Sequence, residues 1–221
     1  GVAIYHQSKV KSIRKKGGQS LIRTDHGQLV TPIVVLACNG YLGRLEPRLT
    51  GAIMPINNFI LATERLGEER ANNLIRNDVA VSDTKFVVDY FRISSDYRLL
   101  FGGGENYTHR FPTDIKSFVR QYMLRVFPQL SEVGIDYAWG GTLAITQSRL
   151  PLFGRLEGDT YYALGYSGQG VALATLAGQV LSNAIAGAVE DFDVFARLPR
   201  RQFPGGALLR WPSLALGMMY Y

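Results

Sequence analysis

The stretch TYYALGYSGQGVALATLAGQVLSNAIAG, residues 160–187, decides the fold class of this chain. Thr160 to Leu164 predicts a short strand, Gly165 to Gly170 a glycine-rich turn, and Val171 to Ala186 an apolar helix. A strand, a turn and a helix in this order are typical of an α/β domain. Glycines let a backbone approach a flat ligand, and a helix N-terminus favours an anion or an electron-rich carbonyl. The alternative is that these glycines only allow close packing of the helix on the strand.

Two better-known loop motifs do not fit this turn. A nucleophile elbow around Ser167 requires a glycine where Gln169 stands, and a later histidine, whereas all three histidines come earlier in the chain. A dinucleotide loop requires a third glycine where Leu173 stands. We therefore exclude serine hydrolase chemistry and do not expect the main pyrophosphate loop here.

A second candidate ligand edge follows the apolar, β-branched run from Ile33 to Ala37. Such a run predicts a strand buried on both faces. It ends in Cys38-Asn39-Gly40, and ligands of α/β sheets bind beyond the carboxyl ends of strands. Asn39 and Gly40 are therefore candidates for lining a site, unless they form an ordinary turn. Cys38 has no adjacent base or cation, so we expect a buried, inert thiol.

The rest of the chain predicts mostly strands. These are expected at Val2 to Tyr5, Lys9 to Ile13, Ser20 to Thr24, Gln28 to Thr31, Phe59 to Thr63, Phe86 to Ile93, Arg98 to Gly102 and Val133 to Ile145. A short helix is expected at Glu68 to Arg76, and a longer one from Ile115 to Phe127 with Thr113 as its N-cap. Gly102-Gly103-Gly104 should break the strand pattern, and the turn-rich stretch Pro47 to Pro55 indicates a domain boundary.

An aromatic-walled pocket with one arginine is a further candidate site. Tyr90, Phe91, Arg92 and Trp139 all fall on expected strands. Alternation along a strand places Tyr90 and Arg92 on one face and Phe91 on the other. The alternative is that these aromatic residues belong to the core.

Composition narrows the function classes. Apolar residues make up 47% and charged residues 19%, which predicts a folded protein with a core. A single cysteine excludes a disulfide framework and a Cys-rich metal site and fits a reducing, cytoplasmic location. Three histidines leave little for a His-based metal site, so we expect no metal. The net charge is +6, but the one tight basic cluster, Arg14-Lys15-Lys16, has no interleaved aromatics, so we do not expect nucleic-acid binding.

The uncharged stretch from Thr160 to Val189 is nearly long enough to span a membrane. Gln179, Ser182 and Asn183 interrupt it, so we expect a packed helix and no membrane span. Gly1 to Val10 has the pattern of a domain interior, and Met218 to Tyr221 is apolar. We therefore expect a fragment of a longer chain.

Several segments together resemble the flavin-dependent amine oxidases related to D-amino acid, glycine and sarcosine oxidases, and among them the gamma-glutamylputrescine oxidase type. The segments are VVLACNGYLG at 34–43, YFRISSDYRLLFGGG at 90–104, WGGTLAITQSRLPLFGR at 139–155, YYALGYSGQGVALATLAGQVLSNAIAG at 161–187 and FARLPRRQFPGGALLRWPSLALGMMYY at 195–221. The resemblance covers nearly the whole chain. The glycine turn is typical of the broad family, and its neighbours point to the narrower type.

The resemblance implies a mixed α/β protein of two domains. Residues 1–46 and 147–221 would belong to an incomplete FAD domain of the glutathione-reductase type, and residues 47–146 to a mixed antiparallel-sheet substrate domain. The family's G-x-G-x-x-G loop lies earlier in the family's sequences and has no counterpart here. The chain would therefore be a C-terminal part that needs the missing N-terminal half and is inactive alone.

The resemblance also assigns site residues. The backbone at Gly165, Tyr166, Ser167, Gly168, Gln169, Gly170 and Val171 would face the pyrimidine edge of noncovalent FAD, with Cys38, Asn39, Gly40 and Gly141 beside the cofactor. A valine at Gly170 should block the flavin by intrusion and strain. Tyr90, Arg92 and Trp139 would form the substrate pocket and are the candidate catalytic residues.

The implied activity is oxidation of the C–N bond of a small-molecule amine, similar to gamma-glutamylputrescine, to an imine with O2 as acceptor. Glycine oxidase-type relatives hold the substrate carboxylate with arginines, where this chain has Gly141 to Leu143 and Gly168. This difference favours a longer amine. The alternatives are a sarcosine, glycine or D-amino acid oxidase and, from another class, a non-catalytic basic binding module.

Overall fold

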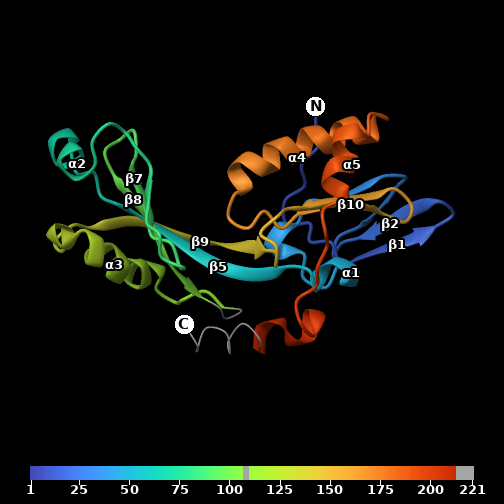
Figure 1. The fold of residues 1–221 in the computed structure, drawn as a ribbon, viewed down its shortest axis with the longest axis horizontal. Helices are drawn as coiled ribbons and strands as arrows, with labels where there is room; N and C mark the ends of the chain where they lie inside the picture. The colour runs from blue at the N-terminus through green and yellow to red at the C-terminus, as the bar shows by residue number, and fades with distance from the viewer. Residues whose placement is uncertain (107–109, 213–221) are drawn as a thin grey trace. The chain divides into compact units, whose positions relative to one another are not determined.

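The computed structural model describes residues 1–106 and 110–212, without the side chains of residues 105 and 106, and the described chain divides into two compact units (Figure 1). Unit 1 contains Gly1–Pro55 and the stretch that begins at Leu143, and unit 2 contains Ile56–Thr142. The domain limits at 46/47 and 146/147 stay predictions. Residues 213–221, the end of the expected second part of the FAD domain, lie outside the described residues.

Unit 1 contains two three-stranded sheets. The first is an antiparallel meander in the order β1-β2-β3. The second has the order β10-β11-β4, in which β11 is antiparallel to β10 and parallel to β4. The strands are β1 (Ser12–Lys16), β2 (Gln19–Arg23), β3 (Gln28–Thr31), β4 (Val34–Leu36), β10 (Leu152–Leu156) and β11 (Thr160–Leu164). The labelled helices are η1 (Asn39–Tyr41), α1 (Pro47–Thr50), α4 (Gly170–Ile185) and α5 (Glu190–Ala196), and residues 206–212 are also helical.

One face of the second sheet is covered by α4 and α5. The buried positions of α4 are Ala177, Val180, Leu181 and Ala184, a helical spacing that directs one stripe onto β10 and β11. The sequence expectation for residues 33–37 is wrong on one point. Val34 and Leu36 are buried, but the Val35 side chain is 42% exposed. Within the described chain only one face of β4 is fully packed.

Unit 2 is built around a five-stranded sheet in the order β6-β7-β8-β5-β9. The strands are β5 (Met54–Thr63), β6 (Val81–Ser82), β7 (Tyr90–Ile93), β8 (Leu99–Asn106) and β9 (Ile135–Ile145). The helices are α2 (Glu68–Leu74), α3 (Ile115–Val126) and η2 (Pro128–Leu130). β5 and β9 are the strands through which the chain passes from one unit to the other.

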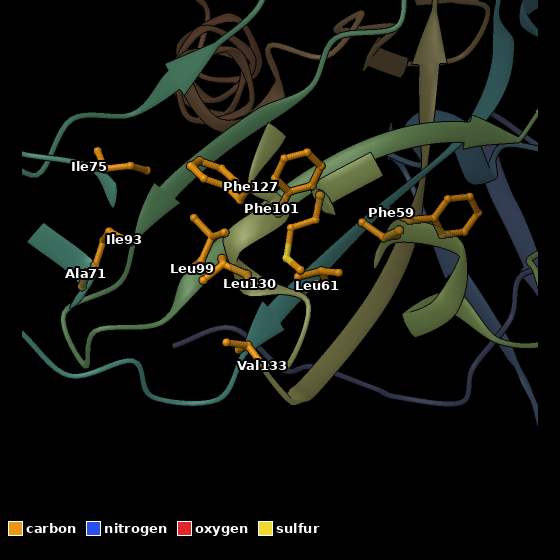
Figure 2. Packing of buried hydrophobic residues seen from close by; sticks show 12 residues of the cluster. Phe59, Leu61, Ala71, Ile75, Ile93, Leu99, Phe101, Phe127, Leu130 and Val133 are labelled. Atoms are coloured by element: carbon orange, nitrogen blue, oxygen red, sulfur yellow. The ribbon is translucent and has the colours of Figure 1, made fainter. Parts of the chain in front are cut away.

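The core of unit 2 lies between one face of this sheet and α3 (Figure 2). Alternate residues of β5 and β8 point into it, including Phe59, Leu61 and Phe101, each fully buried. The Phe101 ring is stacked on Phe91 of β7 at 5.7 Å. This packing leaves the opposite face of the sheet available for polar and aromatic side chains.

Several expected elements differ in the structure. Val2 to Tyr5 is not a strand, and its side chains are exposed because nothing in the described chain packs on them. The strand expected from Lys9 begins at Ser12. β8 continues through Gly102 to Gly104, because Gly102 pairs with Ile60 of β5 and with Tyr90 of β7. The Tyr90 side chain occupies the space that a Cβ atom at Gly102 would need.

The N-cap of α3 is Asp114 rather than Thr113, since the Asp114 carboxylate accepts the Ser117 backbone N–H at 3.0 Å. The sequence pattern predicts no element at α1, α5, β6 or β10. Those segments are short, and β10 carries a glycine and an arginine in a five-residue strand.

The turn of the β7–β8 hairpin is held by the carboxylate of Asp96. Ser94 Oγ donates to it at 2.6 Å and Arg98 Nε at 2.8 Å, and these bonds lower the pKa of Asp96 to about 2. The pKa in the unfolded chain is about 3.9. The folded pKa is the lower one, so this stabilisation is complete above about pH 4 and is lost as the pH falls towards 2.

Asp96→Asn should therefore lower the free energy of unfolding at pH 7 and lose that effect near pH 2. Urea unfolding of both proteins between pH 7 and pH 2 measures the difference. A difference that stays constant over this range would contradict the assignment.

In the described part of the chain, no helix by itself has the length and apolar character to cross a bilayer; α4 and α5 pass such a test only as a pair bent by 119°. Among the side chains of residues 1–104 and 110–212, no three His, Cys, Asp or Glu residues are grouped so that they could hold a metal ion.

Candidate functional site

Three segments of unit 1 meet at the glycine turn that precedes α4. Asn39, after β4, accepts the Gly165 backbone N–H through Oδ1 at 3.0 Å. Ala144, near the end of β9, accepts the Ser167 backbone N–H through its carbonyl at 3.0 Å. The turn is therefore fixed from two sides by the carboxyl ends of two different strands, where α/β sheets place their ligand sites.

The backbone of the turn occupies the left-handed region at Gly165, Ser167 and Gly168, with φ values of +75°, +51° and +96°. A Cβ atom at Gly165 would lie 2.6 Å from Cγ2 of Thr146, so that position has no room for a side chain. A Cβ atom at Gly168 would meet nothing within 4 Å. Gly168 therefore leaves open space beside the turn.

The strain expected at Gly170 is not present. Its φ lies outside the left-handed region, and a Cβ atom there would meet only Tyr166, at 3.7 Å and beyond. A side chain would instead be strained at Gly168, where the φ is positive and the space in front is open.

The N-terminus of α4 directly follows the turn, and no side chain of its first turn neutralises its partial positive charge. The amides of Gly170, Val171 and Ala172 begin α4 and have no intrahelical acceptor. Gln169 contributes no capping side chain, and the first turn has no acidic residue. Val171 is 97% exposed. Amides of this kind can stabilise an anion or the electron-rich edge of a flat ring.

The side chains of the neighbouring candidates face the protein. Tyr166 is buried and donates its Oη proton to the Ala163 carbonyl at 3.2 Å, and burial raises the pKa of its phenol. Burial also raises the pKa of the half-buried Cys38 thiol, which disfavours the thiolate. Gly40 lies in η1 and follows Asn39, whose side chain holds the turn. Tyr166 and Gly40 can therefore offer only backbone groups to a ligand.

The candidates of unit 2 lie on the face of its sheet that is turned away from α3. Tyr90 Oη donates to Asn58 Oδ1 at 2.5 Å, so its ring lies across the strand between them. Phe91 instead packs into the core, which is the alternation expected for β7. The Trp139 side chain on β9 is 46% exposed.

The other two predicted residues of unit 2 are Arg92 and Gly141. Arg92 forms an ion pair with the exposed Asp78 at 3.0 Å. Gly141 lies in β9, and a Cβ atom there would meet nothing within 4 Å. A substrate pocket made from Tyr90, Arg92 and Trp139 stays a prediction.

Sequence reasoning missed two residues that position others. Asn58 holds Tyr90, and the buried Thr146 donates its backbone N–H to Ser167 Oγ at 3.1 Å. Thr146 directly follows a long apolar strand, and a polar residue at a strand end is a pattern that could have indicated a site residue. Asn58 has no comparable signal, because its partner is 32 residues away.

Comparison with known proteins identifies the family of this chain. Residues 1–184 match the DAO family, whose description is FAD dependent oxidoreductase. The chain belongs to the DAO family. The resemblance found in the sequence is therefore confirmed at the level of the family.

Relatives within the DAO family cover the whole chain. Gamma-glutamylputrescine oxidoreductase of Escherichia coli (strain K12) is 42% identical over 222 residues, which are 100% of this chain and 52% of that protein. The probable oxidoreductase OrdL of Rhizobium meliloti (strain 1021) is 38% identical over 221 residues, 100% of this chain and 51% of that protein. The chain thus spans about half the length of these relatives.

The fold is also that of solved DAO-type enzymes. Glycine oxidase from Geobacillus kaustophilus superimposes with a TM-score of 0.73 at 19% identity, over 91% of this chain and 54% of that one. This similarity confirms the predicted mixed α/β class with antiparallel sheets.

Proposed function

We propose that this chain is the C-terminal half of an FAD-dependent oxidoreductase that oxidises the C–N bond of an amine similar to gamma-glutamylputrescine. The observation that carries the proposal is the uncapped glycine turn at the start of α4, fixed by Asn39 and Ala144 in a member of the DAO family. The 42% identity to the Escherichia coli gamma-glutamylputrescine oxidoreductase supports the narrower choice of substrate.

The described residues fit the ring system of FAD. The amides of Gly170, Val171 and Ala172 would hold its electron-rich pyrimidine edge, whereas the N–H groups of Ser167 and Gln169 already donate to the carbonyls of Ala144 and Tyr166. The open space at Gly168 leaves room for a flat ring. When bound, FAD supplies the acceptor for the two electrons that leave the amine and passes them to O2. The raised pKa of Cys38 disfavours the thiolate that a covalent link would need, so we propose noncovalent binding.

Within unit 2, the candidate residues for recognising the amine lie on one sheet. Tyr90 and Trp139 offer an aromatic surface with one fixed phenol, and Gly141 leaves space beside Trp139 on the same strand. No arginine stands at residues 141–143 or at Gly168, where the family resemblance places the carboxylate ligands of glycine oxidase-type enzymes. Arg92 is the remaining candidate to bind a distant carboxylate, in exchange for its ion pair with exposed Asp78.

The open edge of β4 supports the proposal that another half of the same protein completes this site. β4 lies at the end of its sheet in the described chain, and an unpaired strand edge is a ready template for pairing. A groove of about 430 Å³ runs between β4 and α4 and is lined by small or apolar side chains, including Val35, Ala174 and Gly178. We therefore expect this chain alone neither to retain FAD nor to turn over substrate.

The substrate assignment is tested on the gene product that contains this chain, here called the parent protein. We expect the purified parent protein to be yellow and to oxidise gamma-glutamylputrescine with a kcat/KM at least about tenfold above its values for sarcosine, glycine and D-alanine. Peroxide release under saturating O2 measures all four rates.

Two results would contradict the proposal in different ways. A preference for sarcosine or glycine would favour the second candidate, an amino-acid oxidase, which is supported by the structural similarity to glycine oxidase. A colourless parent protein that does not respond to added FAD would favour a non-catalytic basic binding module.

A further inference from the structure

Thr146 is a buried threonine to which the proposed reaction assigns no role. We propose that Thr146 and Ser167 form a positioning pair that fixes the direction of the turn amides and thereby raises the reduction potential of the bound flavin; this inference rests on the proposed function. Thr146 is 3% exposed and follows β9 directly. Its backbone N–H donates to Ser167 Oγ at 3.1 Å, and the two hydroxyl oxygens lie 3.3 Å apart.

The hydrogen-bond pattern leaves the Ser167 hydroxyl fully used by the protein. The Thr146 hydroxyl donates to the Leu150 carbonyl at 2.8 Å, so its proton is directed away from Ser167. The Ser167 proton is then the one shared with Thr146 Oγ1, or given to the Gly165 carbonyl at 3.3 Å. Ser167 Oγ in turn accepts the Thr146 N–H. The hydroxyl therefore holds the turn in place and does not act as a nucleophile.

The backbone of Ser167 explains why the turn needs such a pair. A non-glycine residue at φ +51° lies in the left-handed region, which is disfavoured for residues with a side chain. The backbone N–H bond to Ala144 and the side-chain bonds to Thr146 compensate for this cost. If these bonds are removed, the backbone between Ser167 and the start of α4 is held less firmly, and the N–H groups of Gly170, Val171 and Ala172 can change direction.

Free N–H groups at a helix N-terminus favour the more negatively charged, reduced state of a ligand in front of them. A loss of their fixed direction should therefore shift the equilibrium towards the oxidised state without removing the site. This consequence separates a positioning role from a purely structural one, because general destabilisation would leave the potential of the bound flavin unchanged.

The test compares Thr146→Val and Ser167→Ala with Thr146→Ser in the parent protein. Valine keeps the shape and the backbone N–H of Thr146 but loses the hydroxyl, whereas serine keeps the hydroxyl. We expect the first two variants to retain FAD while their reduction equilibrium against a redox dye shifts about tenfold towards oxidised flavin, which corresponds to about 30 mV for a two-electron couple. Thr146→Ser should stay within about twofold of the wild type.

Thr160→Val is the matched control. Thr160 is also a buried threonine of unit 1, but its Oγ1 atom has no hydrogen-bond partner among the described residues. Removing that hydroxyl should leave the flavin potential unchanged and should not lower the thermal stability. The control thus separates the loss of a buried hydroxyl from the loss of the Thr146–Ser167 pair.

Wild-type potentials in both Thr146→Val and Ser167→Ala would overturn the inference while leaving the proposed function intact. A wild-type parent protein without FAD would instead contradict the proposed function. If Thr146→Val does not fold, Ser167→Gly decides: glycine relieves the backbone strain, so the variant should fold and still show the shift. An unshifted Ser167→Gly would overturn the inference.

Discussion

Gly168→Val should remove FAD from the purified parent protein, whereas Gly187→Val should leave it bound. Gly168 has φ +96°, a conformation that is costly for a β-branched residue, and the new side chain would project into the open space beside the turn. That space is where we place the flavin ring. We expect the dissociation constant for FAD to rise at least about hundredfold, or about 2.7 kcal/mol.

Gly187 is the matched control, because a side chain there would adopt nearly the same disfavoured backbone conformation as at Gly168. It follows the opposite end of α4 and has φ +103°, and a Cβ atom there would also meet nothing within 4 Å. Valine there should lower the thermal stability by a similar amount, because the same backbone conformation is disfavoured. Absorbance at the flavin band, together with thermal unfolding, compares the two variants.

Equal loss of FAD from both variants would mean that general destabilisation of α4 is the cause. Full retention of FAD by Gly168→Val would mean that the space beside the turn is not where the flavin lies. Either outcome would contradict the placement of the cofactor at residues 165–171.

Elements with strong periodicity could be predicted from the sequence. The apolar spacing of α3 and the turn before α4 both agree with the structure, because a helical stripe and a glycine turn are local properties of the chain. The strands expected at Phe86 to Ile93 and Arg98 to Gly102 are present as β7 and β8, although β7 begins only at Tyr90.

Features that depend on distant contacts could not be predicted in the same way. The burial of Val35 depends on what covers β4, and the pattern of a fully buried strand does not reveal whether its cover lies within the chain. β8 continues through three glycines because Gly102 pairs with strands on both sides, and Tyr90 fills the space beside it.

Some residues of the candidate site could likewise be predicted from the sequence, and others could not. Gly165, Ser167 and Gly168 could be proposed from the turn motif alone. Thr146 and the side-chain role of Asn39 required the structure, because their partners are 21 and 126 residues away. Contacts over such separations have no signature in a single sequence.

Hydrogen exchange at the turn tests the placement of the flavin most directly. The amides of Gly170, Val171 and Ala172 have no intrahelical acceptor, so in the FAD-free parent protein they should exchange rapidly. A ligand that accepts hydrogen bonds from this helix end would slow that exchange by about a hundredfold or more. The stretch 186–189 after the other end of α4 serves as the internal reference.

The measurement is amide deuterium uptake by mass spectrometry of the parent protein, with and without FAD, for a peptide that covers residues 165–172. The account predicts strong FAD-dependent protection of this peptide and little change at residues 186–189. Unchanged uptake at 165–172, with protection by FAD elsewhere in the protein, would contradict it.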